Sequence, residues 1–231
     1  METVLITGAN RGVGLELSKR YAAAGNKVLA CCRAPDDAAA LAELAAGNDN
    51  VTVLGVHVSD GNSVAALAAQ LGDTPIDILL NNAGTPGPAP QDQSALNMDY
   101  DGWMETFAVN TMAPLRMIQA LHRNLKAGTN ARAITVTSQM GAISLNMPVM
   151  YAYCSSKAAV NKVMRMISVE LAGDSIAVGL IHPGWVKTDM GGAAAEIEVD
   201  ESAQGIIDVV AGISMDNTGC FKKWNGEDHD W

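Results

Sequence analysis

Aromatic residues and positive charge are both scarce in this chain of 231 residues. Aromatic side chains make up 4% of the sequence, and 15 Lys and Arg stand against 25 Asp and Glu, a formal net charge of −10. A protein that binds nucleic-acid phosphates or an anionic membrane surface needs a basic face. We therefore expect neither nucleic acid nor a membrane as a partner.

Long apolar runs and clustered cysteines are also missing. No apolar stretch approaches the about 20 residues needed to cross a bilayer, and the opening METVLITGAN lacks the basic and apolar regions of a secretory signal. The cysteines at 31, 32, 154 and 220 match neither a metal-ligand spacing nor a dense disulfide framework. We expect a cytoplasmic protein with reduced thiols and no metal centre.

Short β-branched or apolar runs alternate along the chain with alanine-rich stretches that have helical spacing. The expected strands cover residues 3–6, 27–32, 51–56, 76–80, 133–138 and 176–181. Strands that are apolar throughout are buried on both faces, and alternation with helices requires right-handed crossovers. The pattern predicts an α/β fold with a doubly wound parallel sheet of the Rossmann type, in a single domain over residues 1–231.

Four further segments complete this outline. Helical stretches of about 100–125 and 153–171 are longer than the others, and residues 85–97 and 191–199 have loop composition.

A glycine-rich turn follows the first expected strand. The segment TGANRGVG places Gly8, Gly12 and Gly14 before a helix, with a spacing that differs from G-x-G-x-x-G. The physics is the same, because glycines permit a tight turn and let a pyrophosphate approach the helix N-terminus. Taken alone, the glycines are equally compatible with an ordinary strand-to-helix turn.

The end of the second strand bears on the choice of dinucleotide. An acidic residue there holds the ribose of NAD, whereas arginine accommodates the 2′-phosphate of NADP. Here the chain has Cys32 and Arg33, and Arg11 lies in the glycine turn. The two guanidiniums favour NADP(H) over NAD(H), the alternative being two solvated surface arginines.

A tyrosine and a lysine four residues apart begin a predicted helix. Four residues rotate by about 400°, so Tyr153 and Lys157 share a face, whereas Tyr151 points elsewhere. A neighbouring ammonium favours the phenolate and makes a phenol a better proton shuttle. Ser138 ends a strand at the sheet edge where ligands bind. Asn110 is an unfavourable residue inside a helix, so its presence there points to a functional reason.

In this order, TGANRGVG, NNAG at 81–84, Asn110, Ser138, the Tyr153–Lys157 pair and HPGWVKTDMGG resemble the short-chain dehydrogenase/reductase family over essentially the whole chain. The similarity is greatest to its C-factor-like and carbonyl-reductase-like branch. The resemblance implies that Tyr153 is the general acid/base, that Lys157 lowers its pKa and holds the ribose, that Ser138 orients the substrate carbonyl, and that Asn110 carries a water-linked proton relay.

The resemblance also implies a set of cofactor contacts. The glycines would cradle the pyrophosphate, Asn82 and Ala83 would lie along the cofactor, and the segment 183–188 would seat the nicotinamide. The full expected set is Gly8, Asn10, Arg11, Gly12, Val13, Gly14, Arg33, Val58, Asn82, Ala83, Gly84, Tyr153, Lys157, Pro183, Gly184, Val186 and Thr188.

Three features depart from the family pattern. His57 occupies a position near the adenine pocket where many members have Asp, although an inert strand-end histidine is the more ordinary interpretation. The segment between Ser138 and Tyr153 is longer than usual and is apolar through Met140, Met147 and Met150. The stretch after Thr188 is short, which predicts an open substrate pocket.

The implied activity is reversible hydride transfer between NADP(H) and a small carbonyl or alcohol substrate. Two alternatives stay open: a C-factor-like signalling or regulatory protein that keeps the dinucleotide fold, and a 3-oxoacyl-carrier-protein reductase, for which no basic patch is evident. By analogy with the family, we expect a homodimer or homotetramer formed through the two long helices.

Overall fold

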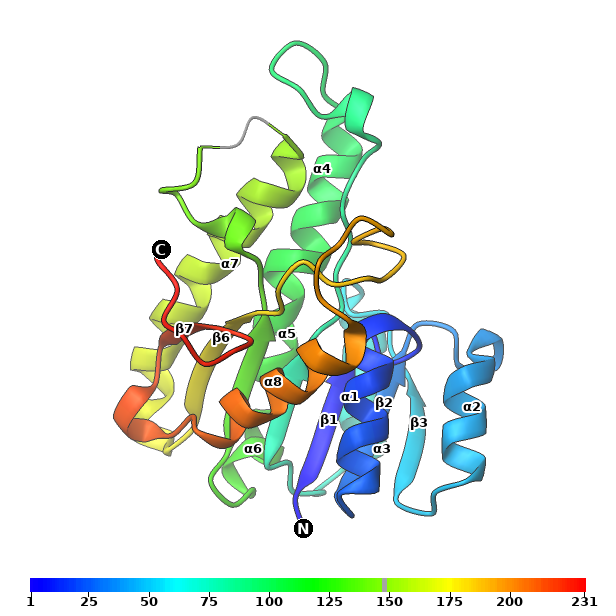
Figure 1. Ribbon diagram of the computed structural model, residues 1–231. Coiled ribbons are helices and arrows are strands. Elements are labelled where there is room, and N and C mark those ends of the chain that lie inside the picture. Colours follow the sequence, from blue (N-terminus) through cyan, green and yellow to red (C-terminus); the bar gives the residue numbers. More distant parts are fainter. Residues whose placement is uncertain (147–148) are drawn as a thin grey trace.

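One parallel sheet organises the molecule (Figure 1). The computed structural model describes residues 1–146 and 149–231, and within these residues the sheet has seven strands in the order β3-β2-β1-β4-β5-β6-β7. Every neighbouring pair is parallel. The strands are β1 (Thr3–Thr7), β2 (Lys27–Cys32), β3 (Val51–Gly55), β4 (Ile78–Asn81), β5 (Arg132–Val136), β6 (Ala177–His182) and β7 (Cys220–Lys223). The predicted doubly wound sheet is confirmed; β7, whose lysines make it only partly apolar, was not anticipated.

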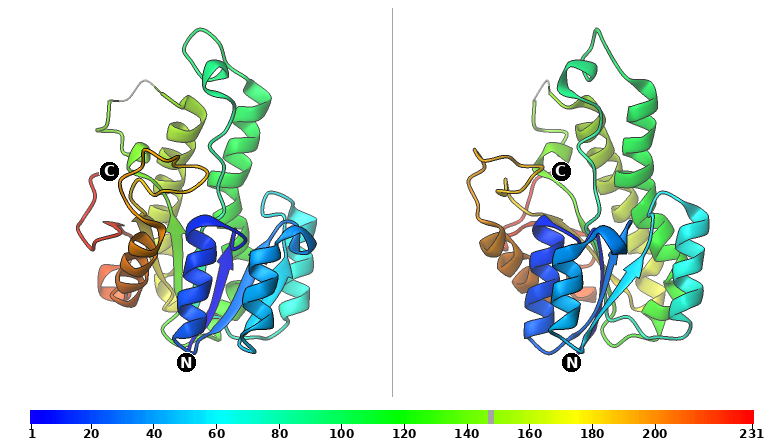
Figure 2. Two further views of the ribbon diagram at one scale, coloured as in Figure 1. Left: turned by 45° about the vertical axis from the view of Figure 1, so that its right-hand side comes forward. Right: turned by 90° about the vertical axis from the view of Figure 1, so that its right-hand side faces the viewer.

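Helices cover both faces of this sheet (Figure 2). They are α1 (Gly12–Ala23), α2 (Ala39–Ala46), α3 (Gly61–Leu71), α4 (Tyr100–Phe107), α5 (Ala113–Ala120), α6 (His122–Lys126), α7 (Tyr151–Glu170) and α8 (Val199–Ala211). Side chains alternate along β1: Val4 and Ile6 pack in the core beneath α1, α2 and α8, whereas Leu5 packs in the core beneath α3, α5 and α7. Two cores therefore bury both faces of each central strand.

The stretch expected to be one long helix over 100–125 is divided. Helix α4 gives way to a π-helical turn at Ala108–Met112, and α5 and α6 follow. Pro114 has no N–H and its ring crowds the carbonyl of residue 110, so a regular helix is disfavoured here. Asn110 lies in this π turn rather than inside a regular α-helix, and such turns are frequent at functional sites.

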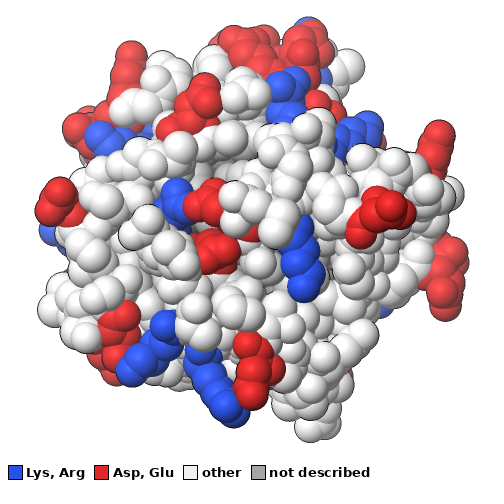
Figure 3. Space-filling view, turned by 90° about the horizontal axis from the view of Figure 1, so that it is seen from below, with Lys and Arg blue, Asp and Glu red and all other residues white. Residues whose placement is uncertain are grey.

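Charged side chains of both signs are mixed on the surface. On the face shown in Figure 3, Lys and Arg side chains are interspersed with Asp and Glu rather than gathered into one basic patch. In the described part of the chain, no helix is long and apolar enough to cross a membrane, and no group of three or more His, Cys, Asp or Glu side chains could hold a metal ion.

Candidate active site

The glycine turn lies against the end of β4. Gly8 has φ +67° and Gly12 has φ +53°, conformations that side chains other than glycine rarely adopt. A Cβ at Gly14 would overlap the Gly8 carbonyl and approach Asn82 Nδ2 to 2.5 Å. That Nδ2 donates to the Thr7 carbonyl (2.9 Å) and to the Gly8 carbonyl (3.2 Å). The expected glycines and Asn82 thus form one tightly packed cradle at the carboxyl edge of the sheet.

Thr7 completes this cradle, and the sequence motif did not single it out. The Thr7 Oγ1 accepts hydrogen bonds from the Asn82 amide (3.0 Å) and the Ala83 amide (3.1 Å). A buried threonine between a strand and a glycine turn was a usable signal, because its hydroxyl can bridge two neighbouring strand ends.

The segment after β6 forms the opposite wall. A Cβ at Gly12 would lie 3.3 Å from Thr188 Cγ2, so the two expected contact regions face each other. Thr188 Oγ1 donates to the carbonyl of the buried Val186 (3.3 Å). The Pro183 carbonyl accepts from Ser202 Oγ on α8 (2.6 Å). Gly184 follows with φ +87°.

The two arginines expected to choose the dinucleotide differ in their surroundings. Arg11 donates to Asp189 Oδ2 (3.0 Å), and both side chains are largely exposed. Arg33 is exposed directly after β2 and has no ion-pair partner among the described residues. Asn10, which precedes Arg11 in the chain, is exposed, and Val13 packs on the core beneath α1. Arg33 is thus the guanidinium that is free to meet an anion.

The adenine end of the expected site is fixed by an arginine from α5. Arg116 Nη1 donates to the carbonyls of Val58 (3.2 Å) and Ser59 (3.0 Å). The His57 Nδ1 is hydrogen-bonded to Ser59 Oγ (3.1 Å), and the His57 amide donates to Ser63 Oγ (2.9 Å). His57 therefore takes part in the turn before α3.

Tyr153 and Lys157 lie in the first two turns of α7. The Lys157 Nζ is 5.6 Å from the centroid of the Tyr153 ring, and it donates to the Val136 carbonyl at the end of β5 (3.0 Å). Burial lowers the pKa of Lys157 from 10.5 to about 8. Burial also raises the pKa of Tyr153, while a hydrogen bond with Ser138 acts in the opposite direction. In the protein alone, Tyr153 is therefore a protonated phenol at neutral pH.

Asn110 is buried beside this pair. Its Oδ1 accepts from the Thr85 amide (2.9 Å), and its Nδ2 donates to the Thr85 carbonyl (2.9 Å) and to Ser156 Oγ (3.0 Å). A Cβ at Gly84 would lie 3.3 Å from Asn110 Oδ1 and 3.8 Å from Lys157 Nζ. The NNAG segment, the π turn and α7 thus meet at one point.

Ser138 closes the site on the side of β5. Its Oγ accepts from the Met140 amide (3.1 Å), which begins a short turn between the strand and the loop toward α7. Ile143, Leu145 and Val149 of that loop are exposed apolar side chains. The expected contribution of Met147 lies outside the described residues.

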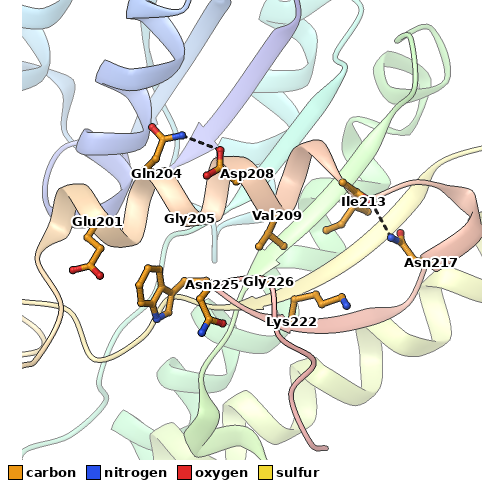
Figure 4. Close-up of a pocket in the computed structure, with 12 residues that line it drawn as sticks. Glu201, Gln204, Gly205, Asp208, Val209, Ile213, Asn217, Lys222, Asn225 and Gly226 are labelled. Carbon is orange, nitrogen blue, oxygen red and sulfur yellow. Dashed lines mark hydrogen bonds between the residues drawn. The ribbon is translucent and has the colours of Figure 1, made fainter.

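A separate groove of about 650 Å³ lies between α8 and the C-terminal strand and shares no residue with the expected site (Figure 4). Its lining includes Glu201, Gly205, Val209, Lys222, Trp224 and Asn225. Gln204 and Asp208 are joined by a hydrogen bond (2.9 Å) on the side of α8 away from Asn225. This groove is not the site at which the sequence motifs converge.

Known proteins are similar to this chain in both sequence and fold. The model of the family "short chain dehydrogenase" matches residues 2–198. C-signal of Myxococcus xanthus is 36% identical over 168 residues, which are 72% of this chain and 99% of that protein.

Two solved structures superpose over the full length of this chain. The NADPH-bound carbonyl reductase from chicken fatty liver has a TM-score of 0.91 at 32% identity, with 99% of that chain covered. The carbonyl reductase Sniffer of D. melanogaster has a TM-score of 0.92 at 29% identity, with 100% of that chain covered. These similarities confirm the resemblance deduced from the motifs, and the chain is an oxidoreductase of the short-chain dehydrogenase family.

Proposed function

We propose that this protein is an NADP(H)-dependent carbonyl reductase that interconverts a small or hydrophobic carbonyl compound and its alcohol. The observation that carries the proposal is the convergence of Ser138, Tyr153, Lys157 and Asn110 beside the glycine cradle. An acid–base pair next to a dinucleotide cradle supplies both parts of such a reaction. The chicken protein with this fold is a carbonyl reductase bound to NADPH.

The residues present fit a dinucleotide. At Gly8 and Gly14 the backbone approaches Ala83 and Asn82 so closely that any Cβ would fill the cradle. A glycine turn of this kind, without side chains at a helix N-terminus, suits a pyrophosphate. Lys157 Nζ points toward Gly84 and the end of β5, where it would hold ribose hydroxyls. The bound nicotinamide would supply hydride transfer to or from the substrate carbon.

The side chains of this protein would supply the proton and the orientation. In carbonyl reduction, the Tyr153 hydroxyl donates its proton to the substrate oxygen while the Ser138 hydroxyl orients the carbonyl. The raised pKa of Tyr153 keeps that proton in place at neutral pH. Lys157, when charged, stabilises the phenolate that remains after the transfer.

Asn110 has a supporting part in this proposal. Its three hydrogen bonds tie the Thr85 backbone to Ser156 on α7, and Ser156 precedes Lys157 in the chain. It thereby fixes the distance between the NNAG segment and the acid–base pair. The water-linked proton relay implied by the family resemblance is part of the same proposal.

The exposed Arg33 supports NADP(H) as the preferred dinucleotide. A guanidinium binds a phosphate through a bidentate, charge-assisted contact, and the 2′-phosphate would lie near the end of β2. Arg11 is a second candidate once it leaves Asp189. An NAD(H) enzyme would instead be expected to place a carboxylate where Arg33 stands.

The proposal is tested by titrating the purified protein with NADPH and NADH and following nicotinamide fluorescence. One phosphate contact predicts at least an about tenfold preference for NADPH. In a second step, a panel of ketones, aldehydes and quinones is reduced by the wild type and by Tyr153→Phe. Loss of the hydroxyl lowers turnover by about 10²–10⁴ and leaves NADPH affinity nearly unchanged. Unchanged turnover in the variant contradicts the assignment of Tyr153.

We also propose that the protein is a homodimer or homotetramer. Exposed apolar side chains lie along α4 and α7, the helices expected to form the contact, with Tyr100 69%, Met104 66%, Met166 61% and Val169 76% exposed. Apolar area of this kind on helix faces is typical of a surface that a second copy covers.

The similarity to C-signal favours a second candidate, a signalling or regulatory role that keeps the dinucleotide fold. The two functions are separated by the experiments above. Tight NADPH binding with no turnover on the carbonyl panel favours the signalling role, whereas turnover that depends on Tyr153 favours the reductase.

A further inference from the structure

Trp224, directly after β7, is wedged between the loop after β6 and helix α8. A Cβ built at Gly184 would lie 3.0 Å from both Cδ1 and Nε1 of the Trp224 indole. On the other side, a Cβ at Gly205 of α8 would lie 2.7 Å from Trp224 Cε3 and would overlap the Trp224 carbonyl. The indole therefore lies between two glycines. A side chain at Gly205 would clash with Trp224, and one at Gly184 would clash with Ile197 as well as with the ring.

The backbone of Trp224 is tied to the same loop. Its amide donates to the carbonyl of His182 (2.8 Å), which is the last residue of β6. Ser202 of α8 donates to the next carbonyl, that of Pro183 (2.6 Å). One backbone hydrogen bond, one side-chain hydrogen bond and the ring contacts thus hold three successive residues, His182 to Gly184.

Trp224 also lines the groove between α8 and β7, together with Gly205 and Asn225. A smaller side chain at 224 would remove the ring that packs between this groove and Gly184. The ring thus has the groove on one side and the loop at Gly184 on the other.

We propose that Trp224 is a positioning residue for the nicotinamide half of the cofactor. It acts through Pro183 and Gly184, the segment expected to seat the nicotinamide, and touches neither substrate nor cofactor itself. This inference rests on the proposed function, because it presupposes that a dinucleotide lies along that segment. Among the described residues, no hydrogen bond joins Trp224 to the adenine half of the site, from Arg33 to Val58.

The expected signature is a split between the two halves of the cofactor. With Trp224→Ala, the loop at Gly184 loses its contacts with the indole ring, whereas the hydrogen bonds of Asn82 in the glycine cradle do not involve Trp224. Affinity for NADPH should fall by about tenfold or more, and kcat should fall with it, since a misplaced reactive group costs up to about 10²-fold. Affinity for 2′,5′-ADP, which lacks the nicotinamide, should stay within twofold.

The experiment measures the dissociation constants of NADPH and 2′,5′-ADP by titration calorimetry for the full chain and its variants. Trp231→Ala is the matched control. Trp231 is in the same C-terminal segment, and its ring centroid lies 5.5 Å from the Phe221 ring centroid and 5.5 Å from Arg165 Cζ. It is not among the atoms nearest to a Cβ at Gly184. Trp224→Phe keeps an aromatic ring in the gap, so it should recover most of the lost NADPH affinity and covers the case in which the alanine variant does not fold.

Each outcome is decisive. Selective loss of NADPH affinity in Trp224→Ala, with recovery in Trp224→Phe and no selective loss in Trp231→Ala, supports the inference. Equal losses for both ligands, or an unchanged NADPH affinity, overturn it and leave the proposed function standing. If the wild type binds neither ligand, the proposed function fails, and this inference fails with it.

Discussion

Replacing Gly14 with alanine tests whether the glycine cradle is as tight as the structure shows. The added Cβ would approach Asn82 Nδ2 to 2.5 Å and overlap the Gly8 carbonyl. Neither neighbour can retreat cheaply, because one is backbone and the other donates to the Thr7 and Gly8 carbonyls. The Asn82 amide must therefore give up contacts, and α1 must shift away from β4.

The magnitude follows from opposing contributions. Overpacking a rigid site costs about 1–3 kcal/mol, and weakening one or two hydrogen bonds costs about 0.5–1.5 kcal/mol each. Alanine in a helix returns about 0.5–1 kcal/mol relative to glycine. With the middle of each range, the net loss in the free energy of unfolding is about 2–3 kcal/mol. This loss lowers the Tm of a chain of this size by about 5–10 °C.

The assay is thermal and urea-induced unfolding followed by circular dichroism. Gly173→Ala serves as the control, because nothing lies within 4 Å of a Cβ at that position, and its effect should stay within about 0.5 kcal/mol. NADPH titration of the same samples should show weakened binding for Gly14→Ala alone. Equal unfolding midpoints and equal NADPH affinities for the two variants would refute the packing argument.

Three further predictions follow from the site. Arg33→Ala should weaken NADPH binding by about tenfold or more and leave NADH binding nearly unchanged, measured by fluorescence titration, and equal losses would mean that Arg33 does not contact the 2′-phosphate. Lys157 has a pKa of about 8 in the folded protein and about 10.5 when unfolded, so between these values the unfolded chain binds more protons. This group therefore makes the free energy of unfolding rise with pH across that window. Lys157→Met should remove that part of the rise, measured by urea unfolding at pH 7.5 and 9.5. Light scattering after size exclusion should give a mass that is a multiple of the 24.1 kDa chain, and a clean monomer at micromolar concentration would contradict the proposed oligomer.

The sequence by itself determined the fold class and the position of each motif. Apolar runs such as 27–32 and 176–181 match β2 and β6 closely, because a strand buried on both faces leaves little choice of residue. The glycine turn and the Tyr153–Lys157 spacing were also legible, since they depend on local backbone geometry. The family assignment followed from the order of these local features.

Only the tertiary structure decided which groups contact one another and which of them are protonated. Asn110, in the π turn between α4 and α5, bonds to Thr85 and Ser156, which are distant in sequence, and no local pattern specifies these contacts. The strand β7 was missed because its pattern is only partly apolar, and the wedge of Trp224 against Gly184 was hidden with it.

The protonation states belong to the same class of property. The sequence favoured a lowered pKa for Tyr153 from the nearby lysine, whereas in the folded protein burial raises it and lowers that of Lys157. Desolvation depends on how many neighbours pack around a group, and that number comes from residues throughout the chain. Local pattern therefore specifies the strands, helices and motifs of this protein, and long-range packing specifies the contacts and charges through which its site would work.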